Sequence, residues 1–82
     1  MTIYDITRTV SPTLKVWPGD TEYAAAAVVT MAGGAPVNLF TLTLSAHTGT
    51  HADAYYHYTK DGAHPAQMPL EQYVGPARVV TV

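Results

Sequence analysis

The sequence contains no cysteine, few charged residues and no long apolar run. Without cysteine the chain has no disulfide framework, no thiolate metal site and no cysteine nucleophile. It carries four lysine and arginine residues in all, and its formal net charge is -2. It therefore lacks the basic stripe that attracts phosphate backbones and anionic membrane surfaces, and we expect no nucleic-acid partner.

No segment has the features of a membrane span or a secretion signal. A helix needs ~20 consecutive apolar residues to cross a bilayer, and every apolar stretch in this sequence is far shorter. Residues 1–10 lack the basic region and the following apolar run of a signal peptide. We therefore expect a cytoplasmic protein with no membrane partner.

The length and the low charge content together predict a small domain that needs a partner. A chain of 82 residues has room for one domain, residues 1–82, with a modest core. Its residues are 48% apolar and only 12% charged. Soluble domains usually contain about 25% charged residues, so part of this surface is expected to be covered by another polypeptide. The β-branched, apolar segment at residues 77–82 would present strand edges that pair readily with another chain, so we also predict a homo-oligomer.

The clearest secondary-structure signal is a strand at residues 37–46. Phe40, Leu42 and Leu44 alternate with the polar residues Thr41, Thr43 and Ser45. This alternation has the period of two of a half-buried strand. Because strand signals outnumber helix signals along the chain, we predict a mostly β domain.

The remaining elements are predicted from shorter patterns. Residues 23–31 combine an alanine run, which favours helix, with valines that favour strand. We predict a strand because two glycines and Pro36 follow at once. A strand is also predicted at residues 3–7, a short helix within residues 65–73 and a last strand at residues 77–82.

The residues able to do chemistry are concentrated just after residues 37–46. All four histidines of the chain, His47, His51, His57 and His64, lie in one stretch with Asp53 among them. Neutral imidazole and carboxylate groups are the usual ligands of Zn²⁺, Mn²⁺ and related ions. His47, His51 and Asp53 are therefore a candidate metal site.

The spacing of the two histidines requires a bent backbone. In a straight strand His47 and His51 would lie about 13 Å apart, too far for one ion to bind both. A helix would place them on one face, but glycine and two β-branched residues between them make a poor helix interior. We predict a turn at Gly49, where glycine can adopt a positive φ, with His51 and Asp53 projecting to one side of the segment after the turn.

A structural interpretation of the same residues stays open at this point. A histidine is more often a surface or satisfied interior residue than a metal ligand, and His64 beside a proline is typical of a loop. Trp17, at the start of a Pro-Gly turn, is more often a packing residue than a ligand contact. The adjacent Tyr55 and Tyr56 are equally compatible with packing.

Residues 47–57 also form a recognisable signature. The run His-Thr-Gly-Thr-His-Ala-Asp-Ala-Tyr-Tyr-His resembles the His-x-Gly-Thr-His-x-Asp-x-Pro-x-His signature of the cyclase-like metal-dependent hydrolases, and among them the kynurenine formamidases, or arylformamidases. Further matching blocks occur in the expected order and cover most of the chain: residues 16–21, 36–38, 42–45, 69–70, 73–76 and 78–80.

The resemblance implies a fold, an activity and an assembly. The fold is a swivelling β/β/α fold of the α/β class, of which this chain would be the N-terminal, mostly β part. The activity is the hydrolysis of N-formylkynurenine to kynurenine and formate in tryptophan degradation, and the assembly is a homodimer. The resemblance thus implies a small-molecule substrate, N-formylkynurenine or a related aryl formamide.

The resemblance also implies roles for particular residues. His47, His51 and Asp53 would bind the metal ion, with Zn²⁺ expected first and Mn²⁺ second, and Asp53 could bridge to another ion. His57 would be the general acid and base, since histidine transfers protons near neutral pH. Trp17 would contact the substrate by stacking on its aniline ring.

Two departures from the family pattern bear on these roles. Tyr55 replaces the signature proline, which removes the rigid turn that would place His57. The family's remaining metal ligands, a histidine and a glutamate, are expected from residues beyond this sequence.

Three classes of function are therefore compatible with the sequence. The first is an arylformamidase that needs the remaining half of its site. The second is a binding module for a metal ion or an aromatic ligand without turnover. The third is a structural remnant of the fold.

Overall fold

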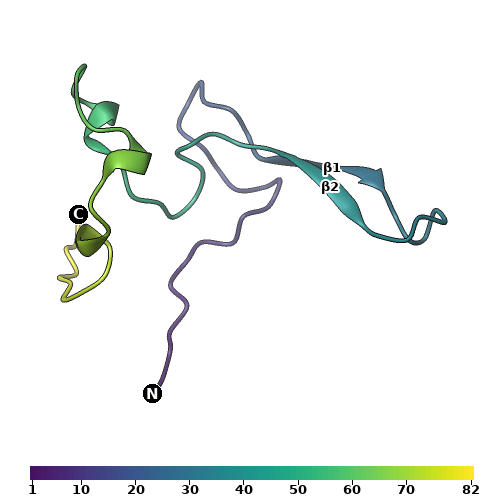
Figure 1. Cartoon of the computed structure of the whole chain (residues 1–82), viewed down its shortest axis with the longest axis horizontal. Helices are drawn as coiled ribbons and strands as arrows, with labels where there is room; N and C mark the ends of the chain where they lie inside the picture. Colours follow the sequence, from purple (N-terminus) through teal and green to yellow (C-terminus); the bar gives the residue numbers. More distant parts are fainter. The chain divides into compact units, whose positions relative to one another are not determined.

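The regular structure is one β-hairpin followed by three single-turn helices. The computed structural model describes all residues 1–82. The strands are β1, Ala24–Val29, and β2, Leu39–Thr43, and the 3₁₀ helices are η1, Tyr55–His57, η2, Pro65–Gln67, and η3, Leu70–Gln72 (Figure 1). The expected mostly β character is confirmed. None of the helices has the length and apolar character needed to cross a membrane.

Strands β1 and β2 pair in an antiparallel sheet. Ala24 lies opposite Thr43 and Ala27 opposite Phe40, and the register shifts between Ala27 and Val29. This confirms the strands predicted at residues 23–31 and 37–46, both of them shorter than predicted. The alanine run adopts the strand conformation because β2 supplies a hydrogen-bonding partner, which outweighs the weak helix preference of alanine.

The hairpin is not half-buried as the alternation predicted. Phe40 is 53% exposed and Leu42 55% exposed, and the residues of both strands are exposed throughout. A two-stranded sheet can bury a face only against another layer, and no second layer packs on this one. Met68, in the second half of the chain, is the one buried hydrophobic residue.

The chain consists of two compact units, Met1–His51 and Ala52–Val82. Its accessible surface is 7710 Å². Most of its large apolar side chains are exposed, Trp17 and Leu70 among them.

Two of the predicted strands are absent. Residues 3–7 and 77–82 adopt no regular structure. The composition of these segments favours strand, but a strand is stable only when its N–H and C=O groups find partners on a neighbouring strand. Neither segment has such a neighbour, so local propensity alone does not produce a strand.

The helix predicted within residues 65–73 is replaced by η2 and η3. Met68 and Pro69, which separate them, have extended ψ angles of 137° and 133°. Proline disfavours the helical conformation of the residue before it, so Pro69 forces Met68 out of the helix. Pro69 itself precedes η3 as its N-cap residue.

The second unit closes a tight loop around η1. The N–H of Tyr56 donates to the carbonyl of Ala63 at 3.1 Å, and the Tyr56 ring stacks on His64 with centroids 4.0 Å apart. A Cβ atom on Gly62 would lie 2.8 Å from the carbonyl carbon of Tyr55, so only glycine fits there. His64, predicted to be a loop residue, thus helps to close this loop.

Candidate metal centre

A turn at Gly49 brings the first two candidate ligands together. Gly49 has a φ of +65°, and the N–H of Thr48 donates to the carbonyl of Ser45 at 3.1 Å. The predicted glycine turn is therefore confirmed. The turn packs within the first unit, because a Cβ built on Gly49 would lie 3.4 Å from the Cδ2 atom of Leu14.

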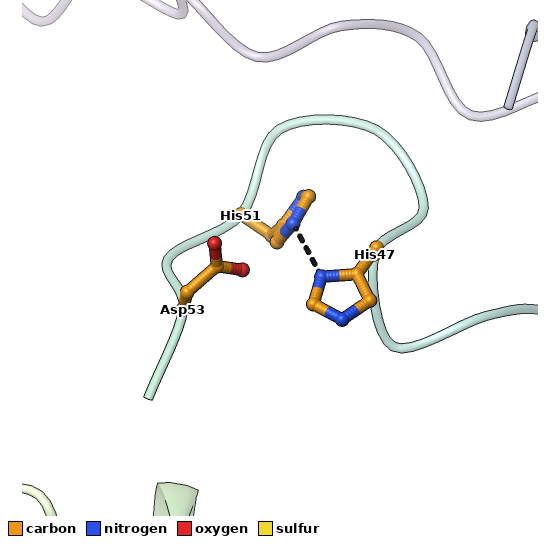
Figure 2. Close-up of side chains that lie close together, drawn as sticks. All are labelled: His47, His51 and Asp53. Atoms are coloured by element: carbon orange, nitrogen blue, oxygen red, sulfur yellow. Dashed lines mark hydrogen bonds between the residues drawn. The ribbon is translucent and has the colours of Figure 1, made fainter. Parts of the chain in front are cut away.

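The ring nitrogens of the two histidines face each other. The Nδ1 atom of His47 lies 3.1 Å from the Nε2 atom of His51, and the rings meet edge to face with centroids 5.1 Å apart (Figure 2). Asp53 follows two residues later. One potential ligand atom from each of His47, His51 and Asp53 lies within 4.8 Å of the other two.

A second hydrogen bond decides how His51 presents its ring. The Nδ1 atom of His51 lies 2.8 Å from the carbonyl oxygen of Gly49, and a carbonyl oxygen can only accept. The Nδ1 atom of His51 is therefore the donor, and in the neutral ring the lone pair lies on Nε2. Backbone carbonyls commonly orient metal-binding histidines in this way, and they make the imidazole a better ligand.

The arrangement fits a divalent metal ion. Two imidazole nitrogens at about 2.05 Å from a tetrahedral Zn²⁺ lie about 3.3 Å apart. The observed separation of the two nitrogens is 3.1 Å, so the two rings need to move apart only slightly for one ion to bind both. His51 and Asp53 are exposed and His47 is half-buried, so their side chains can adjust and the remaining coordination positions stay open. Open positions are typical of catalytic rather than closed structural sites.

Asp20 also belongs to the neighbourhood of this site, and the sequence reasoning missed it. Its N–H donates to the carbonyl of Trp17 at 2.9 Å, which closes a turn whose third residue, Gly19, has a φ of +88°. Hydrogen bonds from the Ser45 hydroxyl and the Thr21 N–H lower the pKa of Asp20 below its ordinary value of 3.8; desolvation opposes them, and the charge of His47 adds a weaker lowering. An acidic residue directly after a Pro-Gly pair was the available signal.

The other predicted functional residues lie on separate elements. Trp17 is 80% exposed and is the first residue of the turn that the Asp20 N–H closes. His57 ends η1 in the second unit, where its N–H donates to the carbonyl of Ala54 at 3.0 Å and its ring lies against Tyr58. The metal-ligand geometry therefore groups His47, His51 and Asp53.

One buried polar atom in the turn has no hydrogen-bond partner. Thr48, between the two histidines, is only 8% exposed, and its Oγ1 atom makes no hydrogen bond. The adjacent threonine behaves differently, because the Oγ1 atom of Thr50 accepts a hydrogen bond from the N–H of Arg8 at 2.9 Å.

The fold and the site define a mostly β chain with a His-His-Asp group that could hold a metal ion. Comparison with known proteins places it in a family. Residues 4–82 match the cyclase family, described as "Putative cyclase", and the chain belongs to that family.

Two relatives carry the same functional name. The chain is 49% identical over 79 residues to the kynurenine formamidase of Maricaulis maris (strain MCS10), covering 96% of this chain and 38% of the relative. It is 46% identical over 78 residues to the kynurenine formamidase of Erythrobacter litoralis (strain HTCC2594), covering 95% of this chain and 36% of the relative. The chain thus spans less than two fifths of the length of these relatives.

Proposed function

We propose that this chain is part of a metal-dependent hydrolase of the kynurenine formamidase type, which converts N-formylkynurenine to kynurenine and formate in tryptophan degradation. One observation carries the proposal: the Nδ1 atom of His47 and the Nε2 atom of His51 lie 3.1 Å apart beside Asp53. Its context is a family whose relatives bear the name kynurenine formamidase.

In this proposal His47, His51 and Asp53 hold the ion, with Zn²⁺ expected before Mn²⁺. A divalent ion at such a site polarises a carbonyl group and lowers the pKa of bound water toward ~7. The hydrogen bond from His51 Nδ1 to the Gly49 carbonyl would leave the Nε2 atom of His51 as the one that could hold the ion. Residues 1–82 form the N-terminal portion of the domain.

Two further residues act on the substrate. His57 exchanges a proton with the departing arylamine, because an imidazole can both accept and donate a proton near neutral pH. Trp17, with most of its ring in solvent, stacks on the aniline ring of the substrate. Additional metal ligands, a histidine and a glutamate, come from residues outside this sequence.

The same trio also supports a second function, a metal-binding module without turnover. Two of the three ligands are exposed in this chain, so an ion can reach them without any further part of the protein. The hydrolase turns over its substrate and the binding module does not, so an activity assay distinguishes these two functions. A structural remnant differs from both because it would bind no metal.

Metal binding and complementation test these functions. The chain, purified without chelator, is expected to retain a divalent metal that is lost from His47→Ala and His51→Ala but kept by His64→Ala. Equal metal content in all four proteins would show that the site is wrongly assigned. Mixing the chain with the separately produced remainder of a related kynurenine formamidase is then expected to release formate from N-formylkynurenine. Metal binding without formate release would support the module instead.

A further inference from the structure

The single turn η1, which ends at His57, contains little that would hold its own shape. It has three residues, Tyr55–His57, and no side chain caps its start at Ala54. A lone helical turn is unstable because several residues are ordered for one hydrogen bond. Contacts from outside η1 must therefore fix it, and residues 58–63, here called the closing segment, supply several of them.

The closing segment binds both polar groups of one peptide bond in η1. The carbonyl of Tyr55 accepts hydrogen bonds from the N–H groups of Tyr58 at 3.1 Å and Thr59 at 3.0 Å. The N–H of Tyr56 donates to the carbonyl of Ala63 at 3.1 Å. The peptide unit between Tyr55 and Tyr56 is thus held from both of its sides, which fixes the orientation of its plane.

Gly62 lies against that same peptide bond. A Cβ atom built on Gly62 would lie 2.8 Å from the carbonyl carbon of Tyr55 and 2.9 Å from the nitrogen of Tyr56. Carbon atoms in favourable contact are about 3.5–4.0 Å apart, and both of these atoms belong to the backbone, which cannot turn aside as a flexible side chain can. Gly62 is not among the glycines with a positive φ, so the position demands glycine for lack of space and not for its conformation.

We propose that Gly62 is a positioning residue: without a side chain, it lets the closing segment pack on the Tyr55–Tyr56 peptide, which sets the direction of His57. Because His57 directly follows this peptide, a shift of the peptide plane moves the imidazole with it. The inference rests on the proposed function only in taking His57 as the general acid and base. A proton-transferring group has to lie within hydrogen-bond reach of its target, so its direction matters for turnover.

A role of Gly62 in folding alone would lead to different results. If Gly62 only stabilised the second unit, its substitution would still lower the activity of an enzyme that already lacks His57. If Gly62 positions His57, then kcat falls while KM stays the same, because the lost interaction acts only in the transition state. The loss of activity then disappears in a His57→Ala background, since the two residues act as one unit.

The variants are Gly62→Ala alone, Gly62→Ala with His57→Ala, and Gly62→Ala with Tyr55→Pro. The last is a rescue, because Tyr55 is the first residue of η1, where proline is favoured. It follows Ala54, whose ψ of 160° suits a residue before proline. Asp61→Ala is the matched control, because it introduces alanine at the adjacent, exposed position.

Formate release from N-formylkynurenine is measured in the full chain complemented with the remainder of a related kynurenine formamidase. We expect Gly62→Ala to lower kcat by roughly 100-fold, the loss that a displacement of ~1 Å can cause, with KM and metal content unchanged. Adding Tyr55→Pro should restore part of kcat, and Asp61→Ala should leave kcat as it is. An unchanged kcat in Gly62→Ala, or a further loss when it is added to His57→Ala, would overturn the positioning role.

Nuclear magnetic resonance of the chain alone separates this inference from the proposed function. Gly62→Ala should shift the ring signals of His57 and accelerate hydrogen exchange at the N–H of Tyr56, and Tyr55→Pro should reverse the shift. If the unaltered complemented chain releases no formate, the proposed function fails, and the ring signals then decide the positioning role. Unchanged His57 signals in Gly62→Ala would overturn that role whether or not the enzyme turns over.

Far-UV circular dichroism guards against loss of folding. If Gly62→Ala loses the spectrum of the unaltered chain, then a variant with one glycine inserted after Gly62 replaces it, because the insertion loosens the closing segment without introducing a clash. The same fall in kcat and the same shift of the His57 signals are expected. Their absence in a folded insertion variant would overturn the positioning role.

Discussion

His47 and His51 share a hydrogen bond between ring nitrogens that a metal ion would have to replace. Because His51 Nδ1 donates to the Gly49 carbonyl, its Nε2 atom is the acceptor, and in the neutral pair His47 Nδ1 is the donor. Metal binding therefore requires His47 to give up its Nδ1 proton, either to its own Nε2 atom or to solvent. The two histidines are brought together before any ion arrives, so less ordering remains for the binding step.

The turn at Gly49 provides the first prediction. Alanine at this position would adopt a positive φ of 65° at a cost of about 1–2 kcal/mol, and we expect Gly49→Ala to weaken metal binding as the turn opens. Gly34→Ala is the control, because Gly34 also has a positive φ but lies in the connection between β1 and β2. Circular dichroism and Co²⁺ titration check this. Equal metal affinity in Gly49→Ala and the unaltered chain would contradict it.

The second prediction concerns the hydroxyl of Thr48, which has no hydrogen-bond partner. Thr48→Val keeps the shape of the side chain and removes a buried polar atom, so the free energy of unfolding is expected to stay the same or to rise by about 1 kcal/mol. For Thr50→Val the free energy of unfolding is expected to fall by about 1 kcal/mol, because this change removes the hydrogen-bond acceptor of the Arg8 N–H. Urea unfolding measures both. A clear loss of stability in Thr48→Val would mean that its hydroxyl has a partner.

The third prediction concerns pH. The hydrogen bonds from Ser45 and Thr21 and the charge of His47 lower the folded-state pKa of Asp20 below 3.8, so the carboxylate contributes stability above that value. This contribution is lost as the pH falls through the folded-state pKa. The stability difference between the unaltered chain and Asp20→Asn should therefore be present at neutral pH and disappear in acid. A difference that does not change with pH would contradict the assigned cause.

The fourth prediction tests His57. In the chain complemented with the remainder of a related enzyme, His57→Ala is expected to lower kcat by about 10²- to 10⁴-fold while metal content stays unchanged. His64→Ala, which removes the ring stacked on Tyr56, is the control and should keep most of the activity. Full activity in His57→Ala would exclude it as the general acid and base. The chain alone is expected to release little or no formate.

The fifth prediction concerns self-association. Val79 is 96% exposed and Val80 is 69% exposed, and removing apolar surface from water contributes about 25 cal/mol per Å². We expect a homo-oligomer at micromolar concentration by light scattering. Val80→Lys should disperse it without changing metal binding, because a charge is costly in an apolar contact. Lys60→Arg serves as an exposed control. A monomer with a sharp thermal transition would contradict this prediction.

Much of the metal loop could be predicted from the sequence because its determinants are local. Two histidines four residues apart can meet only if the backbone bends between them, and Gly49 is the residue that permits the bend. The presence of β1 and β2 was equally accessible, since both segments have strand character and turn residues separate them. The roles of His57 and Trp17 came from resemblance, and they remain proposals.

Only the tertiary structure decided which strand-like segments become strands and what lies beside the site. Residues 3–7 and 77–82 have strand composition but no neighbour to pair with, and hydrogen-bond partners cannot be deduced from composition. The sequence by itself determined the candidate ligands and the bend that joins His47 to His51. The effect of Ser45 on the pKa of Asp20 required the hairpin to fold, because it joins two segments whose proximity depends on strand register.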